Sequence, residues 1–148
     1  MSNVRYIGIV DDHAMFRKGL AVLINMFPGY EVLLDAANGS DFIKKLQPEQ
    51  LPDIVLMDIN MPEMDGYSTT EWIRDHHPQI KVLALSTMDS ETAIIKMIKS
   101  GAKGYILKDA DTNELKIAFE EVMSRGYFYN EAVTQKILQA VNSEVKRS

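Results

Sequence analysis

Residues 52–58 have the sequence PDIVLMD. A proline and an aspartate open this stretch, apolar residues follow without interruption at 54–57, and Asp58 comes directly after them. A short run that is apolar on both faces is typical of a central strand in a parallel sheet, where helices cover both sides. The stretch therefore predicts an α/β fold in which Asp58 stands at the carboxyl end of a buried strand.

On both sides of this run, apolar segments of strand length alternate with amphipathic segments of helix length. A helical period is clear after the first strand, where Met15, Phe16, Leu20 and Leu23 recur on one face. Strict alternation of this kind predicts a five-stranded parallel sheet with helices on both faces. The expected strands are residues 4–10, 32–34, 54–57, 81–85 and 104–107.

Capping residues mark the expected helix boundaries. Asp89 or Ser90 can cap the N-terminus of a fourth helix. After a fifth helix, Gly126 suits a helix end and Asn130 suits the start of a sixth helix. This sixth helix either closes the core of the domain or leads away from it, and the polar residues 142–148 are expected to be linker.

The composition is that of one ordered globular domain. The chain has 148 residues, of which 46% are hydrophobic and 25% are charged. Its net charge of -5 provides no general attraction for nucleic acid or an anionic membrane. The absence of cysteine excludes disulfides, thiolate metal sites and cysteine nucleophiles. No apolar run is long enough to span a bilayer, and we expect a cytoplasmic location.

Polar residues that can do chemistry follow the expected strands at their carboxyl ends. In parallel α/β sheets these ends meet at one edge, where ligands bind. Three neighbouring carboxylates repel one another strongly unless a cation lies between them. Oxygen ligands favour a hard ion, and Mg²⁺ retains waters that a phosphate can displace. The residues concerned are Asp11, Asp12, Asp58, Ser86, Thr87 and Lys108.

This set of side chains suits phosphoryl transfer. A carboxylate such as that of Asp58 can act as a nucleophile and form an aspartyl phosphate. Lys108 and the Ser86 hydroxyl would then neutralise and hydrogen-bond the phosphoryl oxygens. Taken singly, each residue is more often a turn, a helix cap or a surface charge. Their joint occurrence at four strand ends favours a phosphoacceptor site.

Three separated motifs resemble the receiver domains of two-component response regulators. They are VDDH at 10–13, LMDINMPEMDG at 56–66 and GAKGYILKD at 101–109. The resemblance covers about residues 4–125, and the third motif resembles the subfamily with a C-terminal helix-turn-helix DNA-binding domain. It implies a flavodoxin-like (βα)5 fold with strand order 2-1-3-4-5.

The resemblance also implies a role for each matching residue. Asp58 corresponds to the phosphoacceptor. Asp12 and Asp58 would hold Mg²⁺ through their carboxylates, Asp11 would act largely through water, and the Asn60 backbone carbonyl would complete the protein ligands.

Three further residues correspond to positions that sense or stabilise the phosphoryl group. Lys108 matches the lysine of the family's active site. Ser86 matches the hydroxyl switch position and Tyr105 the aromatic switch position. For Tyr105 a purely structural role as a buried strand aromatic is the alternative interpretation.

The resemblance further implies partners and a domain organisation. The phosphodonor would be a phosphohistidine on a sensor histidine kinase or phosphotransfer protein. Residues 1–125 would form the receiver, and residues 126–148 would form an additional helix and the start of a linker to an output domain. We expect a phosphorylation-dependent homodimer or altered partner contact through the fourth helix, fifth strand and fifth helix. We expect no DNA binding by this chain alone, and no membrane contact.

Two other functions remain open from the sequence. A Mg²⁺-dependent phosphatase or phosphotransferase would turn over through the same intermediate, but such enzymes usually place a second Asp near the nucleophile. Here Ile59 and Asn60 follow Asp58. A phosphorylation-independent interaction domain is the second alternative, and the intact acidic pocket with Lys108 argues against it.

Overall fold

The computed structural model describes residues 3–59, 61, 64–87 and 90–147, with the side chains of 144–147 left aside. Within these residues one parallel sheet has the strand order β2-β1-β3-β4-β5-β6. Its strands are β1 (Arg5–Val10), β2 (Tyr30–Ala36), β3 (Ile54–Asp58), β4 (Lys81–Ser86), β5 (Gly104–Leu107) and β6 (Phe128–Tyr129). The helices are α1 (Ala14–Asn25), α2 (Gly39–Lys45), α3 (Gly66–His76), α4 (Glu91–Ser100), α5 (Thr112–Arg125) and α6 (Glu131–Arg147).

The expected fold class is confirmed, but the expected number of strands is wrong. A sixth strand, β6, pairs with β5 in parallel through Gly104↔Phe128 and Tyr105↔Tyr129. A strand of only two residues carries no readable period, so the sequence pattern did not indicate it. A Cβ on residue 104 would come within 2.5 Å of the Phe128 carbonyl oxygen, so the glycine allows this close pairing.

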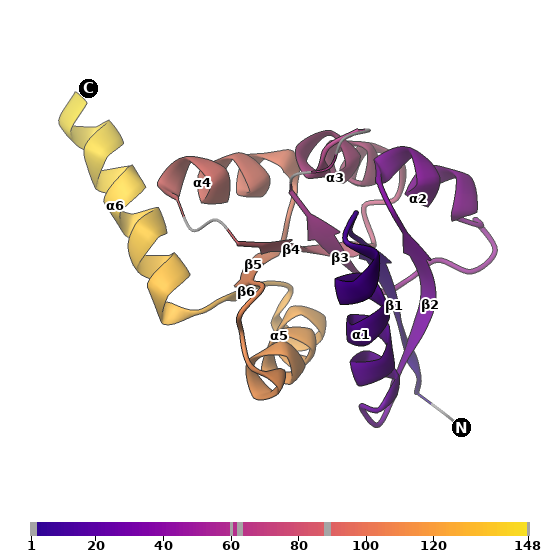
Figure 1. The fold of residues 1–148 in the computed structure, drawn as a ribbon. Helices are drawn as coiled ribbons and strands as arrows, with labels where there is room; N and C mark the ends of the chain where they lie inside the picture. The colour runs from indigo at the N-terminus through magenta and orange to yellow at the C-terminus, as the bar shows by residue number, and fades with distance from the viewer. Residues whose placement is uncertain (1–2, 60, 62–63, 88–89, 148) are drawn as a thin grey trace.

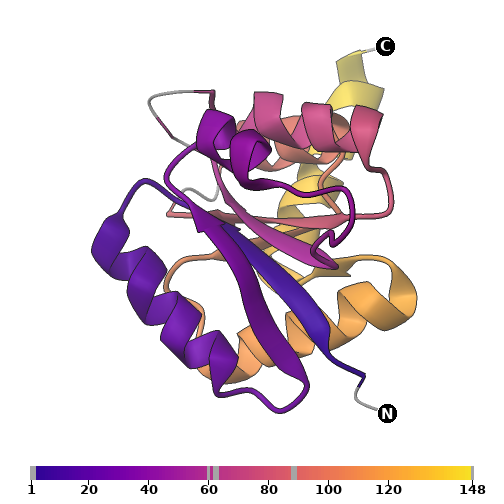
Figure 2. The ribbon, with the colours of Figure 1, turned by 90° about the vertical axis from the view of Figure 1, so that its right-hand side faces the viewer.

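Two layers of helices enclose the sheet. Figure 1 shows α2, α3 and α4 on one face of the sheet and α1 and α5 on the other, and Figure 2 shows the same layers from the side. Strand β3 contributes side chains to the core on both faces of the sheet, because its alternate residues point to opposite faces. Val55 and Met57 belong to the core under α2, α3 and α4, and Ile54 and Leu56 belong to the core over α1 and α5.

Capping residues mark the helix boundaries that the sequence indicated. The Ser90 hydroxyl accepts a hydrogen bond from the Ala93 amide at the start of α4, which resolves the choice between residues 89 and 90. Gly126 ends α5 with a φ of 90°, in the left-handed region that glycine adopts readily. Asn130 accepts a hydrogen bond from the Val133 amide and so caps α6.

Helix α6 packs against α4 and is longer than expected. It runs to Arg147, through residues that the sequence suggested as linker. Val133 is only 1% exposed and belongs to the same core as Ile94 and Met97 of α4. In Figure 1 α6 begins near β6, its middle turns pass the end of α4, and its C-terminal end extends away from the sheet. Among the helices described, none has the length and apolar character that crossing a bilayer requires.

Candidate functional site

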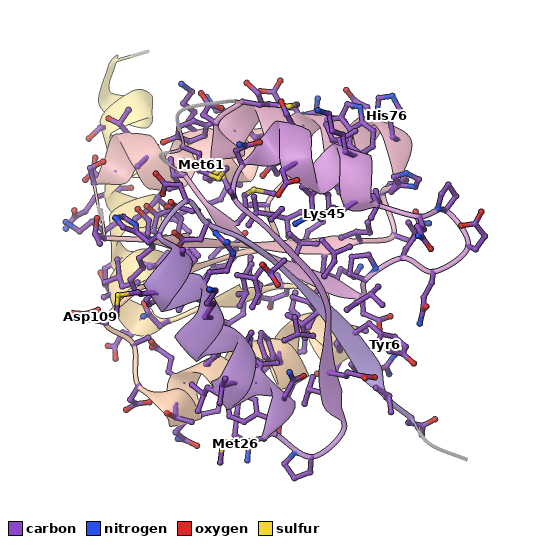
Figure 3. The ribbon with its side chains drawn as sticks, turned by 45° about the vertical axis from the view of Figure 1, so that its right-hand side comes forward. Tyr6, Met26, Lys45, Met61, His76 and Asp109 are labelled. Carbon is purple, nitrogen blue, oxygen red and sulfur yellow. The ribbon has the colours of Figure 1, made fainter. Side chains whose placement is uncertain are left out.

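The carboxyl ends of the central strands bring the predicted residues to one edge of the sheet. Val10 of β1 pairs with Met57 of β3, so Asp11 and Asp58 follow neighbouring positions on adjacent strands. Ser86 ends β4 beside Leu107 of β5, and Lys108 comes next. Figure 3 marks this edge by Met61 and Asp109, while His76 and Tyr6 lie at the opposite edge.

Four side chains at this edge form an acidic cluster. Carboxylate oxygens of Asp11, Asp12 and Asp58 and a ring nitrogen of His13 all lie within 4.8 Å of one another. Asp11 is fully buried, and Asp58 is 5% exposed. The Asp12 side chain is 34% exposed and faces solvent in part. The structure therefore brings together the three carboxylates that the sequence placed here.

Lys108 supplies positive charge to the cluster. Its ammonium lies 2.8 Å from Asp11 Oδ2 and 3.7 Å from Asp58 Oδ1, with 12% of the side chain exposed. The Lys108 amide donates to the Ser86 carbonyl, which fixes the start of its loop against the end of β4. In this state the lysine therefore pairs most closely with Asp11, and Asp58 is its second neighbour.

Three carboxylates around one ammonium leave Asp58 poorly compensated. Burial and, after it, the Asp11 carboxylate raise the pKa of the Asp58 carboxyl to about 6, against the opposing effect of Lys108. At neutral pH the group is still mostly ionised and can act as a nucleophile. Additional positive charge would stabilise this ionised form, so the donor set suits a hard cation.

Backbone contacts orient the Asp11 residue on several sides. Its amide donates to the Ala36 carbonyl, and its Oδ1 accepts from the His13 amide at 2.8 Å. The guanidinium of Arg17 donates to its carbonyl at 2.6 Å. Sequence reasoning missed Arg17, although one signal was available. It lies one turn into α1, and helical side chains lean toward the N-terminus of their helix, here toward the strand end.

His13 lies beside Asp11 and Asp12, and its side chain is mostly exposed to solvent. Its ring nitrogen Nδ1 is 3.5 Å from Asp11 Oδ1 and 3.6 Å from Asp12 Oδ1, and its side chain is 73% exposed. In the structure His13 is the residue that precedes α1 as its N-cap.

A glycine allows α3 to begin against the backbone of Asp58. The Gly66 amide donates to the Ile59 carbonyl at 2.9 Å. A Cβ at residue 66 would clash with the Asp58 carbonyl oxygen and would come within 2.8 Å of the Ile59 Cα. Residue 66 therefore lies so close to the backbone of Asp58 and Ile59 that there is no space for a side chain.

The two expected switch residues are both buried. Ser86 is 2% exposed at the end of β4, and Tyr105 is fully covered between its strand neighbours Ala84 and Tyr129. A hollow of about 270 Å³, lined by Thr87, Leu107, Lys108 and Asp109, lies at the same edge. Asn60, expected to contribute a backbone carbonyl, lies outside the described residues.

Comparison with protein families identifies one match that covers most of the chain. Residues 7–120 match the family model described as the response regulator receiver domain. A solved structure of similar extent is the two-component response regulator of the LuxR family from Aurantimonas sp. SI85-9A1. It superposes with a TM-score of 0.83 and 30% identity, over 93% of this chain and 97% of that one.

Two similar curated proteins are transcriptional or oxygen regulators. The transcriptional regulatory protein DegU of Brevibacillus brevis is 35% identical over 131 residues, which are 88% of this chain and 55% of that protein. The oxygen regulatory protein NreC of Staphylococcus aureus (strain JH9) is 38% identical over 115 residues, 77% of this chain and 52% of that protein. The chain thus spans about half the length of these relatives.

Proposed function

This chain belongs to the response regulator receiver family of two-component systems, and within that family we propose that Asp58 is its phosphoacceptor. The observation that carries the proposal is the convergence of Asp11, Asp12, Asp58 and Lys108 at one sheet edge. Asp58 is the carboxylate that ends the central strand, and its raised pKa marks a group whose charge is incompletely compensated.

The proposed reaction is one in-line transfer. A carboxylate oxygen of Asp58 attacks the phosphorus of a phosphohistidine. The new O–P bond forms as the N–P bond breaks, and the bonding electron pair stays on the imidazole nitrogen, which takes up a proton. Lys108 can follow the developing charge, because its ammonium lies within 3.7 Å of Asp58 before transfer. Ser86, at the end of β4, would donate a hydrogen bond to a phosphoryl oxygen.

The donor set also fits Mg²⁺. Asp12 and Asp58 would hold the ion through carboxylates, Asp11 through water, and Asn60 through its backbone carbonyl. When bound, the ion would neutralise charge on the phosphoryl oxygens. The chain's own contribution is to keep the three carboxylates within 4.8 Å of one another, an arrangement that repulsion would otherwise disperse.

The domain signals, and we propose that its own residues assist both gain and loss of the phosphoryl group. The donor would be a sensor histidine kinase or a phosphotransfer protein, encountered in the cytoplasm. The alternative, a phosphoesterase, usually has a second Asp shortly after the nucleophile in the sequence, whereas Ile59 and Asn60 follow Asp58 here. The next residue, Ile59, is apolar and fully buried, which favours the signalling function.

The proposed output path runs through Ser86, Tyr105 and α4. Tyr105 pairs directly with Tyr129 of β6, and Val133 of α6 packs in the core that α4 covers. A displacement of α4 would therefore reach α6. A phosphorylation-dependent homodimer through α4, β5 and α5 would have to include or displace this helix.

We further propose that residues 1–125 are the receiver proper and that 126–148 connect it to an output domain in the complete protein. The relatives, about twice as long, support this organisation. The net charge of -5 gives this chain no general attraction for DNA, so DNA binding would belong to that output domain.

Intact-mass measurement after incubation with phosphoramidate and Mg²⁺ tests the proposal. We expect one added phosphoryl group on the wild-type chain, none on Asp58→Asn, and none after chelation of the metal. Labelling of Asp58→Asn at the wild-type rate would refute the assignment. Repeated turnover of a small phosphate ester would instead favour the enzyme.

A further inference from the structure

Arg17 joins the acidic loop to the neighbouring strand through two short contacts. Its Nε donates to Asp35 Oδ1 at 2.8 Å, and its Nη1 donates to the Asp11 carbonyl at 2.6 Å. The Arg17 side chain is only 14% exposed, although the Asp35 side chain is 46% exposed. Charge-assisted contacts of this length from a largely buried guanidinium strongly restrict the groups they join.

The contact with Asp11 acts on the main chain of the loop that bears both acidic residues. Asp11 is fully buried, and its two carboxylate oxygens contact the His13 amide and Lys108. Its amide is held by the Ala36 carbonyl of β2. Arg17 holds the remaining polar atom, the carbonyl, which belongs to the peptide group leading directly to Asp12.

The other end of Arg17 is anchored to the body of the domain. Lys45 of α2 donates to the Asp35 carbonyl at 2.9 Å and pairs with Asp41 at 3.1 Å. A chain of contacts therefore runs from α2 through β2 and Arg17 to the loop between β1 and α1. The Asp12 side chain is 34% exposed. These contacts therefore fix the backbone of Asp12.

We propose that Arg17 is a positioning residue that holds the Asp11–Asp12 backbone in the arrangement the cation site requires. The inference rests on the proposed function. It assigns to Arg17 no contact with the cation or the phosphoryl group. Loss of the Arg17 contacts should let the loop relax under the repulsion of its carboxylates, so that binding must first restore their arrangement.

The expected effect is on cation affinity and much less on transfer itself. Loss of an outer group that orients a metal ligand typically weakens binding by about 10-fold to 100-fold. We expect Arg17→Ala to weaken Mg²⁺ binding by about 10-fold or more. At saturating Mg²⁺ its phosphorylation rate should return to within about 2-fold of wild type, because Asp58 and Lys108 are unchanged. Arg17→Lys, which can form only one of the two contacts, should lie between.

Arg74 provides a matched control at the opposite edge of the sheet. It too joins a carboxylate and a carbonyl, because its Nε donates to Asp75 Oδ1 at 3.0 Å and its Nη1 donates to the Lys99 carbonyl at 3.2 Å. Arg74→Ala removes the same kind of side chain from α3 without touching the acidic cluster. It should leave both the Mg²⁺ affinity and the Mg²⁺ dependence of phosphorylation at wild-type values.

The experiment is calorimetric titration of Mg²⁺ into the four proteins, together with phosphorylation by phosphoramidate at a series of Mg²⁺ concentrations. Weaker binding by Arg17→Ala, partial recovery in Arg17→Lys and no change in Arg74→Ala would support the inference. Equal affinity of Arg17→Ala and wild type would overturn it, as would a slower rate that saturating Mg²⁺ does not restore.

Two safeguards keep the result decisive. If Arg17→Ala does not fold, Asp35→Asn retains the guanidinium but removes its anchoring charge, and it should weaken Mg²⁺ binding in the same direction by less. Unchanged binding in Asp35→Asn and Arg17→Lys would then overturn the inference. A wild-type chain that binds no Mg²⁺ and accepts no phosphoryl group would refute the proposed function, whereas wild-type behaviour of the Arg17 variants refutes only the role of Arg17.

Discussion

Asp58→Asn should stabilise the folded chain in the absence of divalent cations. The substitution keeps the shape of the side chain and removes one of three clustered carboxylates. The pKa of Asp58 rises from 3.8 to about 6 on folding, chiefly through burial and then through Asp11. The ionised carboxylate is therefore less favourable in the folded state than in the unfolded chain.

The sign of the pH dependence follows from proton binding. Between about pH 4 and pH 6 the folded state holds a proton that the unfolded chain has released, so stability falls as pH rises through this window. At about 1.36 kcal/mol per pH unit, the raised pKa of Asp58 lowers the stability of the fold by about 3 kcal/mol at pH 8 and by about 1.5 kcal/mol at pH 5. Asp58→Asn should recover about 1–3 kcal/mol at pH 8, because the buried amide also needs partners.

Urea unfolding followed by circular dichroism, in the presence of a chelator, measures this effect. The gain from Asp58→Asn should be larger at pH 8 than at pH 5, and added Mg²⁺ should reduce it by stabilising the wild-type chain. Asp109→Asn is the matched control, because it removes the same charge from an exposed position near Lys108. It should change stability by less than about 0.5 kcal/mol at either pH.

The reasoning would be refuted by an Asp58→Asn protein that is no more stable than wild type at pH 8 without metal. It would equally be refuted by a gain that grows as the pH falls from 8 to 5. Either result would mean that the ionised Asp58 carboxylate is better compensated in the folded state than its contacts indicate.

Four further substitutions, one of them a control, test other parts of the structure. Lys108→Ala should lower stability in chelator by about 3 kcal/mol, because it leaves buried Asp11 without its cation, and it should slow phosphorylation; wild-type unfolding and labelling curves would contradict both roles. Gly66→Ala should impair Mg²⁺-dependent phosphorylation, because the new Cβ must displace the Asp58 backbone; an unchanged labelling rate would contradict the steric argument. Val133→Ala should lower the free energy of unfolding, measured in urea, by about 1–3 kcal/mol. Leu138→Ala, at a half-exposed position of α6, should lower it by less than about 0.5 kcal/mol. Equally small effects would show that α6 does not contribute to the core.

Much of the fold and of the candidate site was predictable from the chain alone. The alternation of apolar runs and amphipathic segments predicted the parallel sheet and its two helical layers. Placing Asp11, Asp58, Ser86 and Lys108 at one edge needed no knowledge of contacts. In such a sheet all strands point the same way, so residues after each strand meet at that edge.

Other features depended on the packed structure. Strand β6 is too short to show a period and exists through its pairing with Gly104 and Tyr105 of β5. The same packing carries α6 along α4 and extends it to Arg147, beyond the boundary that polar composition suggested. Local propensity could not decide these points, because their stabilising contacts join segments distant in the sequence.

The geometry within the site was also decided at the tertiary level. The sequence placed Lys108 and three carboxylates together, but the packed chain sets the ammonium at 2.8 Å from Asp11 and 3.7 Å from Asp58. It also directs Arg17 to the Asp11 carbonyl, a contact that no motif indicated. Strand periodicity determines which edge a residue occupies. Distances within that edge depend on strand register and on the rotation of each helix about its axis, and these are set by the packing of the whole core.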